Sequence, residues 1–322
     1  MHQRQVRDLP AILLTLLITL LPAPVLAWHE TGHRKTATIA WEQLTVDEQD
    51  RIAIIIRAHP RFREDFADLL PHNVDAAAAD SWYFTQAAVW PDHIQDLGDD
   101  VRAEYHRSRW HYINVPVYLE ETDRERLAGR LDHNMVLEFT PPLRQNLNVI
   151  QALQGNLGVW HDATATDADK AVALCWILHL TGDLHQPLHT VALFSSAYFP
   201  RGDRGGNEIP VAWDARTRNL HSVWDGLPTD MRTFDASAAT HARLGAERVA
   251  DAKIDNWLWR HAGLARDHVY TKALRVDLLR GLRESELREL ELDNNYLTNA
   301  RSIAQQQVVL AGYRLAALLQ AR

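Results

Sequence analysis

The residues from Asp169 to Leu184 are almost wholly apolar, and they constrain the fold more than any other part of the sequence. A helix that is apolar all round must be buried, so we expect a central helix with other helices packed around it. His179 and Asp183 nevertheless lie within this stretch, four residues apart. On a helix this spacing directs both side chains from one face toward one point. Burying an imidazole and a carboxylate is costly unless they find partners, and metal coordination is one way to offset that cost.

The sequence after this stretch adds three more candidate metal ligands. Pro187 should end the central helix at about Gln186, so His189 lies just beyond the helix end and can turn back toward the same cavity. His221 and Asp225 form a second pair with a spacing of four residues. Two such pairs in apolar, tryptophan-rich sequence favour a metal site.

Three further candidates lie earlier in the chain. They are His33, Asp92 in the motif Trp-Pro-Asp, and His111 in the motif Trp-His-Tyr-Ile-Asn. A single histidine is more often a surface or hydrogen-bonded residue than a ligand. Histidine and aspartate together, without cysteine ligands, are typical of catalytic zinc sites. The spacing alone leaves the number of ions open, and the one cysteine, Cys175, excludes an internal disulfide.

The rest of the chain predicts an all-α fold in a single domain, because apolar residues recur at helical spacing and no repeat or linker interrupts them. Thr45 and Glu48 form a capping-box pattern at the start of one helix. The other expected helices cover residues 33–44, 135–153, 169–184, 234–252, 254–274 and 297–320. Residues 90–100 and 195–214 are expected to be loops, and residues 208–213 could form one strand of a short β-hairpin.

The N-terminus has the pattern of a signal peptide. Arg4 and Arg7 precede an apolar segment at residues 11–21, and a small-residue cleavage site ends at Ala27. The alternative, an uncleaved signal anchor, is disfavoured because the apolar segment is too short to span a bilayer. We therefore expect residues 1–27 to be removed. Residues 28–322 would form a periplasmic or secreted domain that begins at Trp28 and has no membrane anchor.

Several motifs together resemble the S1/P1 nuclease family, in that family's order along nearly the whole mature chain. They are Trp28 with His33, Trp90-Pro91-Asp92, His111-Tyr112-Ile113-Asn114, His179 with Asp183 and His189, the glycine-rich segment 202–207, His221 with Trp224-Asp225, and residues 311–316. The resemblance implies an all-α fold of the phospholipase C/P1 nuclease type with three zinc ions. It also implies hydrolysis of single-stranded DNA and RNA to 5′-phosphorylated products and removal of 3′-phosphates from nucleotides. We expect the protein to be a monomer.

Carried over residue by residue, the resemblance assigns nine metal ligands. One zinc takes Asp92, His111, His179 and Asp183; a second shares Asp183 and adds His33 with the α-amino nitrogen and carbonyl oxygen of Trp28; the third takes His189, His221 and Asp225. Asp183 and Asp92 are then the catalytic carboxylates. The net charge of the chain is -8, which argues against a basic nucleic-acid surface. Three zinc ions would supply the positive charge that a polyanionic substrate needs.

Two residues are candidates for substrate contact. Asn207 follows two glycines and could contact a nucleotide or cap a turn; we favour the contact. Gln95 stands where the family usually has a phosphate-binding arginine, three positions after the aspartate of the Trp-x-Asp motif. Arg102 or Arg204 could take over that role.

Two alternative functions remain open at this point. A zinc-dependent phospholipase C resembles the same fold and ligand order, but its last ligand is usually glutamate. Its first histidine also lies further from the N-terminal tryptophan, so Asp225 and the short step from Trp28 to His33 favour the nuclease. The other alternative is a periplasmic zinc-binding helical protein without catalytic activity.

Overall fold

The computed structural model describes residues 28–131, 133–213, 216–228, 243–247, 251, 253–284 and 288–320. The expected signal peptide and most of the expected helix at 234–252 lie outside these residues. None of the described helices combines the length and the apolar character needed to cross a membrane.

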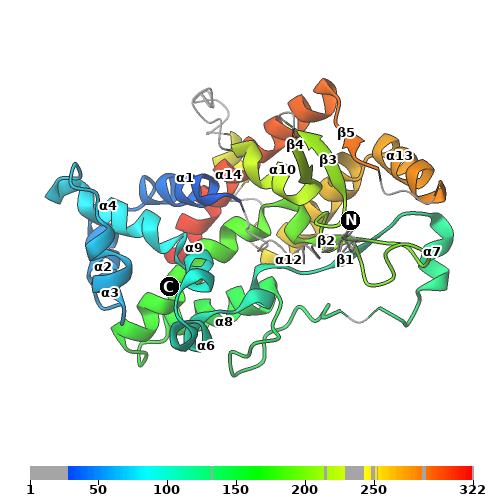
Figure 1. The fold of residues 1–322 in the computed structure, drawn as a ribbon. Coiled ribbons are helices and arrows are strands. Elements are labelled where there is room, and N and C mark those ends of the chain that lie inside the picture. The colour runs from blue at the N-terminus through cyan, green and yellow to red at the C-terminus, as the bar shows by residue number, and fades with distance from the viewer. Residues whose placement is uncertain are drawn as a thin grey trace, which may run out of the picture.

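Helix α9 (Asp167–Leu184) forms the centre of the structure, as its apolar sequence predicts. From Ala173 to Leu184 every residue of this helix is buried. Helices α8 (Val149–His161), α14 (Asn294–Gln320) and α2 (Val46–Arg57) pack against it. Figure 1 shows α9 running through the middle of the bundle, with α1 and α14 on one side and α8 on the other.

Further helices, each of 12 residues or fewer, surround this core. They are α1 (Glu30–Trp41), α3 (Phe62–Asp65), η1 (Ala67–Leu69), α4 (Ala76–Ala87), α5 (Trp90–His93), η2 (Ile94–Asp96), α6 (Asp99–Tyr105), η3 (Ser108–His111), α7 (Glu121–Arg126), η4 (Pro187–His189), α10 (Leu220–Gly226), α12 (Ile254–Leu264), the π-helical turn η6 (Ala265–Val269) and α13 (Lys272–Arg283). The capping box at the start of α2 is confirmed: Thr45 accepts a hydrogen bond from the Glu48 amide, and the Glu48 side chain accepts one from the Thr45 amide.

Two small sheets accompany the helices. Strand β1 (Val115–Tyr118) pairs in parallel with β2 (Val191–Phe194). Strands β3 (Pro210–Trp213) and β4 (Arg216–Asn219) form the expected hairpin, and β5 (Leu290–Glu291) pairs with β3. The first sheet matters for function because β1 begins four residues after His111 and β2 begins two residues after His189. It therefore fixes both candidate ligands relative to each other.

The helix expected at residues 135–153 is wrong for most of its length, because α8 begins only at Val149. Asn148 caps this helix through a capping box with Gln151, and its side-chain amide also donates to the carbonyl oxygens of Asn134 and Val136. These bonds hold the preceding segment against α8 as irregular chain. Its apolar residues pack onto the outside of α8, and their spacing in the sequence is the same as that of a continuing helix.

Two other expectations need correction. The helix expected at 254–274 is interrupted: α12 ends at Leu264, η6 follows, and Thr271 caps a separate helix α13 by accepting from the Leu274 amide. The expected loop at 90–100 contains α5, η2 and the start of α6. The terminal helix expected at 297–320 is confirmed as α14, and the helix expected at 33–44 begins three residues earlier, as α1.

Candidate metal centre

Helix α9 and the turn that follows it bring three candidate ligands around one buried space. His179, Asp183 and His189 are all fully buried. The helix ends before Pro187, and the short turn η4 then reverses the chain. As a result, Nδ1 of His189 lies 4.0 Å from Oδ1 of Asp183.

Asp92 and His111 complete the first group. Nδ1 of His111 lies 3.1 Å from Oδ2 of Asp183 and 3.0 Å from Nε2 of His179. Oδ1 of Asp92 lies 3.5 Å from Nε2 of His179 and 3.8 Å from Nδ1 of His111. Nδ1–H of His179 donates to the carbonyl oxygen of Ala88 over 2.8 Å, so its Nε2 directs a lone pair toward the other side chains. Metal-binding histidines are commonly fixed in this way.

His33 joins this group from helix α1. Its ring stacks on that of His179 with a centroid distance of 4.0 Å, and its Nε2 lies 3.4 Å from Oδ1 of Asp183. Among the described residues, neither ring nitrogen of His33 nor Oδ1 of Asp183 has a hydrogen-bond partner, although all three atoms are buried. Such orphaned polar atoms are costly, and their convergence favours a cation between them. The close approach needs a glycine at position 182, because a Cβ there would lie 2.6 Å from Nδ1 of His33.

His189, His221 and Asp225 form the second group. Nδ1–H of His189 donates to the carbonyl oxygen of His111 over 2.6 Å, and Nδ1–H of His221 donates to that of Gly205 over 2.7 Å. With both Nδ1 protons held in this way, the two Nε2 atoms face each other across 3.1 Å. Oδ2 of Asp225 lies 3.4 Å from Nε2 of His221. The three atoms are thus placed to bind one metal cation.

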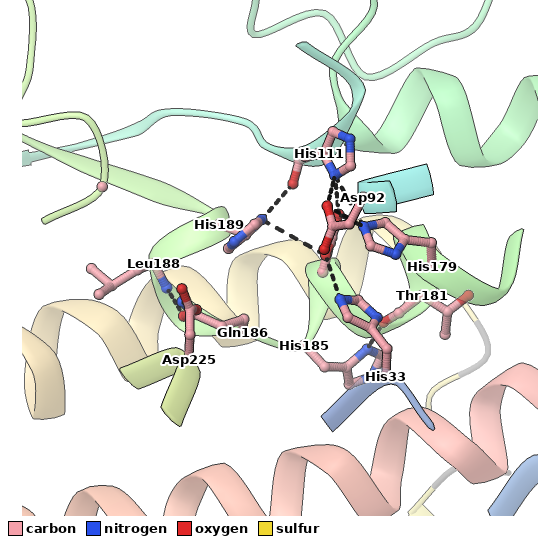
Figure 2. A network of polar contacts seen from close by, with 12 residues as sticks. His33, Asp92, His111, His179, Thr181, His185, Gln186, Leu188, His189 and Asp225 are labelled. Atoms are coloured by element: carbon pink, nitrogen blue, oxygen red, sulfur yellow. Dashed lines mark hydrogen bonds and ion pairs between the residues drawn. The ribbon is translucent and has the colours of Figure 1, made fainter. Parts of the chain in front are cut away.

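Gln186 orients the carboxylate of the second group. Its Nε2 donates to Oδ1 of Asp225 over 2.8 Å, and its Oε1 accepts from the amide of Leu188 over 2.6 Å. Figure 2 shows these bonds, and it also shows the contacts through which the carboxylate of Asp183 links His33 to His189. The sequence alone does not indicate this role of Gln186. Its one signal there is its position between two candidate ligands.

Burial dominates the electrostatics of the cluster. It raises the pKa of Asp92 to about 7 and that of Asp183 to about 6, and it holds the pKa of Asp225 well above its usual range. Burial also lowers the pKa of His179 and His189 well below their ordinary value. These two imidazoles are therefore neutral, and ionised carboxylates beside them are costly without a neighbouring cation. A divalent ion would remove that cost.

The donor atoms fit zinc. All are imidazole nitrogens or carboxylate oxygens, which suit this ion without any cysteine. Ligand atoms around a tetrahedral zinc at ~2.1 Å lie ~3.4 Å apart. The contacts of Nδ1 of His111 with Nε2 of His179 and with Oδ1 of Asp92 measure 3.0 and 3.8 Å, and the ligand atoms of the triplet His189, His221 and Asp225 lie within 4.8 Å of one another. Eight predicted side-chain ligands thus converge in the structure.

The other predicted residues lie around these groups. Trp28 is fully buried, and the amide of the next residue, His29, donates to the carbonyl oxygen of Asp225 over 3.2 Å. The start of the described chain therefore lies against α10, which carries two ligands. Asn207 is half-buried and donates through Nδ2 to the carbonyl oxygen of Arg204, which closes its own turn. Gln95 is half-buried in η2.

A buried aspartate shapes the glycine-rich loop that holds His221. Asp203 accepts hydrogen bonds from the amides of Leu193 and Gly206 and from the Tyr270 hydroxyl. Gly205, at φ 62°, adopts a left-handed backbone conformation that favours glycine. Its carbonyl oxygen thereby faces His221. The sequence indicated this loop only through its glycines.

A second polar network lies behind α9. Nδ1–H of His185 donates to the carbonyl oxygen of Thr181, and its Nε2 accepts from Nη1 of Arg314 over 2.9 Å. Arg314 is fully buried, pairs with Asp251 at 3.0 Å and stacks over the ring of Trp257. His185 is thus tied to α14 and points away from the candidate ligands. Its role is structural.

The S1/P1 nuclease family model matches residues 28–322. The chain belongs to the S1/P1 nuclease family. The match begins at Trp28 and contains every residue of the cluster described above. The fold and the ligand order that the motifs imply are therefore those of a recognised family.

Curated relatives agree with this assignment. Endonuclease 5 of Arabidopsis thaliana is 27% identical over 238 residues, which cover 71% of this chain and 66% of the relative. Nuclease S1 of Aspergillus oryzae is 30% identical over 168 residues, covering 46% of this chain and 53% of the relative. Nuclease P1 of Penicillium citrinum is 39% identical over 64 residues, or 20% of each chain. The chain thus spans less than two thirds of the length of each of these three relatives.

This member of the S1/P1 family has a small cavity beside its second group of ligands. The cavity has a volume of about 90 Å³. His221 and Gly205 line it on one side, and Tyr112, Asn114 and Arg204 contribute aromatic, amide and cationic groups. These groups offer contacts to a base and a phosphate within reach of the ligands.

Proposed function

We propose that this protein is a zinc-dependent nuclease that hydrolyses single-stranded DNA and RNA to 5′-phosphorylated products and also removes 3′-phosphates from nucleotides. The observation that carries the proposal is the pair of Nε2 atoms of His189 and His221, which face each other across 3.1 Å while backbone carbonyls hold both Nδ1 protons. This arrangement places two imidazole nitrogens where they can bind one cation together. The zinc dependence of the S1/P1 family supports the same ion here.

We assign three zinc ions. The first is held by Asp92, His111, His179 and Asp183; the second by Asp183, His33 and the backbone nitrogen and carbonyl oxygen of Trp28; the third by His189, His221 and Asp225. Nε2 of His33 and Oδ1 of Asp183 are buried and have no hydrogen-bond partner among the described residues, which supports the second ion. Asp183 would serve the first two ions together, in keeping with the close contacts that this fully buried carboxylate makes with three of their histidines, His33, His111 and His179.

Zinc at these positions would supply Lewis-acid stabilisation of the phosphate and lower the pKa of a water molecule toward neutrality. The protein's part is to hold neutral imidazoles in place through the carbonyl oxygens of Ala88, His111 and Gly205. Asp92 and Asp183 supply the negative charge that keeps the first two ions together. No protein side chain is then needed as a general base.

Substrate contacts would come from the small cavity and its rim. The half-buried ring of Tyr112 offers a face for a base, and the exposed Arg204 offers a cation for phosphate. Of the two candidates to replace the usual arginine, Arg204 lies in this cavity, whereas Arg102 pairs with Asp99 on α6. Asn207 would turn its side chain to the nucleotide, and Gln95 would contact phosphate only as a neutral amide.

The proposal extends to the N-terminus. Removal of residues 1–27 during export would give Trp28 the free amine that the second zinc needs. The start of the family match at the same residue supports this boundary. The mature protein would then be a soluble, monomeric periplasmic or secreted enzyme. Sequencing the N-terminus of the exported protein tests the boundary, and any start other than Trp28 contradicts it.

One experiment separates the candidate functions. The chain beginning at Trp28 is incubated with single-stranded DNA, single-stranded RNA, 3′-AMP and phosphatidylcholine, with zinc and after chelation. We expect zinc-dependent cleavage of the single strands to 5′-phosphorylated ends. Asp183→Asn should abolish it, while Asp99→Asn, a matched change at an exposed aspartate, should not. Cleavage of phosphatidylcholine alone would indicate a phospholipase, and no cleavage at all would indicate a zinc-binding protein without this activity.

A further inference from the structure

A second cavity lies apart from the metal centre, between strand β1 and helices α7, α12 and α13. Its volume is about 280 Å³. We call it the Trp259 pocket and define it by Tyr118, Arg124, Trp259, Arg266 and Arg275. Within the described residues Glu121 is the one acidic side chain that lines it. The pocket is therefore cationic on a chain whose net charge is -8.

Trp259 is unusual among the tryptophans of this protein. All eleven tryptophans lie in the described part of the chain, and Trp259 alone is exposed, with 52% of its surface accessible. Tryptophan is normally well buried, and the neighbouring Trp257 is only 2% exposed. An exposed indole beside guanidinium groups offers a flat surface on which a nucleic-acid base can stack.

The arginines of the pocket can accept an anion. Among the described residues, neither Arg124 nor Arg275 forms an ion pair with a carboxylate; Arg124 lies over the ring of Tyr118 at 5.6 Å. Arg266 pairs with Asp267 at 2.8 Å, but both side chains are exposed. Exposed pairs of this kind are weak and exchange readily for another anion. Three guanidinium groups around one cavity suit phosphate, which they bind with two parallel hydrogen bonds.

Strand β1 connects this pocket to the metal centre. Tyr112 and Asn114 line the small cavity beside His221, and the next four residues of the chain, Val115–Tyr118, line the Trp259 pocket. At ~3.3 Å per residue, the step from Asn114 to Tyr118 is about 13 Å. One extended polynucleotide strand can therefore reach both places along this edge.

We propose that the Trp259 pocket binds single-stranded nucleic acid outside the metal centre, with a base stacked on Trp259 and phosphates on Arg124 and Arg275. This inference rests on the proposed nuclease function, because it assigns the pocket to the same substrate. The pocket would hold the strand beyond the position of cleavage. It should therefore matter for long strands and make no difference to a single nucleotide.

The test measures binding and hydrolysis separately on the zinc-loaded protein. Binding uses a fluorescent 20-nucleotide single strand with phosphorothioate linkages, which keep the charge and resist cleavage. Trp259→Leu keeps an apolar side chain but removes the stacking surface, and we expect Kd to rise ~5–150-fold. The double variant Arg124→Gln/Arg275→Gln should weaken binding and reduce the slope of log Kd against log salt by about 1.4, or ~0.7 per phosphate contact. Hydrolysis of 3′-AMP should remain at the wild-type rate in both.

The control is a double variant that loses two positive charges outside the Trp259 pocket. Arg63→Gln/Arg301→Gln removes two exposed arginines that do not line the pocket, and it should bind the strand almost as the wild type does. Wild-type binding by both pocket variants would overturn the proposal even if the enzyme cleaves single strands. The proposal would also be overturned if the pocket bound anionic phospholipid vesicles and did not bind the single strand. A protein that binds the strand through Trp259 but cleaves nothing would contradict the nuclease function and leave the pocket assignment standing.

Discussion

Gly182→Ala tests whether His33 belongs to the metal centre. Gly182 lies on α9 directly before Asp183, and a Cβ at this position would lie 2.6 Å from Nδ1 and 2.9 Å from Cε1 of His33. Ordinary contact begins at ~3.4 Å, so the imidazole must retreat by about 0.8 Å. Zinc–nitrogen bonds tolerate only ~0.2 Å around ~2.1 Å. The displaced ring therefore loses its bond unless other ligands move as well.

Gly182→Ala should change both the stability of the metal-free protein and its affinity for zinc. Alanine in place of glycine favours the helix by about 1 kcal/mol, whereas overpacking costs ~1–3 kcal/mol. The free energy of unfolding of the metal-free protein should thus change by no more than ~2 kcal/mol. Zinc affinity should change far more: substitutions next to a ligand already cost ~10–100-fold, so losing His33 should weaken one ion by ~100-fold or more.

The assay equilibrates the protein with buffers of graded free zinc and measures zinc per molecule by mass spectrometry. Gly158→Ala is the matched control, since a Cβ at Gly158 on α8 meets no atom within 4 Å. This control should keep every zinc and gain up to ~1 kcal/mol of stability. Gly182→Ala should lose one zinc at concentrations where the wild type and the control keep all of theirs. A wild-type zinc count across the whole series would refute the assignment of His33.

Three further predictions concern substrate, pH and processing. Gln95→Arg should lower KM for a single-stranded oligonucleotide, because a guanidinium binds phosphate better than an amide; an unchanged KM would mean that Arg204 already fills this role. Burial lowers the pKa of His59 to about 4, so the stability that this neutral ring contributes is complete above pH 6.5 and is lost as pH falls toward 4. We therefore expect the free energy of unfolding, measured in urea titrations with chelator, to fall between pH 7 and pH 4 by about 3 kcal/mol less in His59→Phe than in the wild type. An equal fall in both proteins would contradict this. A chain that keeps a methionine before Trp28 should retain its helical content but lose one zinc per molecule and most of its activity; a normal zinc count there would show that the Trp28 amine is not a ligand.

The central helix and its ligands could be predicted from the sequence because they depend on short-range geometry. An apolar stretch that contains His179 and Asp183 four residues apart allows few structures other than a buried helix with both side chains on one face. The capping box at Thr45 and the hairpin at β3 and β4 are local in the same sense. Such features need no knowledge of distant contacts.

The start of α8 could not be predicted in this way. Apolar residues such as Phe139 and Leu143 continue the helical periodicity upstream of Val149, but they pack onto the helix at Gly155 from outside. The capping bonds of Asn148 decide the boundary, and their partners lie at residues 134 and 136. Periodicity records that a residue is buried, and it does not distinguish burial within a helix from burial against one.

The residues that support the ligands could not be predicted from the sequence either. Gly182 and Gln186 matter because of what lies opposite them: the ring of His33 in one case and the carboxylate of Asp225 in the other. The carbonyl oxygens that fix the histidine tautomers belong to Ala88, His111 and Gly205, whose side chains play no part in that bond. No pattern of side chains along the sequence could indicate them.

Diffraction at the zinc absorption edge, from crystals of the chain beginning at Trp28, locates each bound zinc ion. We expect three anomalous peaks: one between Nε2 of His189 and Nε2 of His221, and two that share the carboxylate of Asp183. The peak nearer to His33 should also lie within bonding distance of the Trp28 amine. Zinc found only on surface histidines, with no peak between His189 and His221, would show that these buried side chains do not form a zinc site.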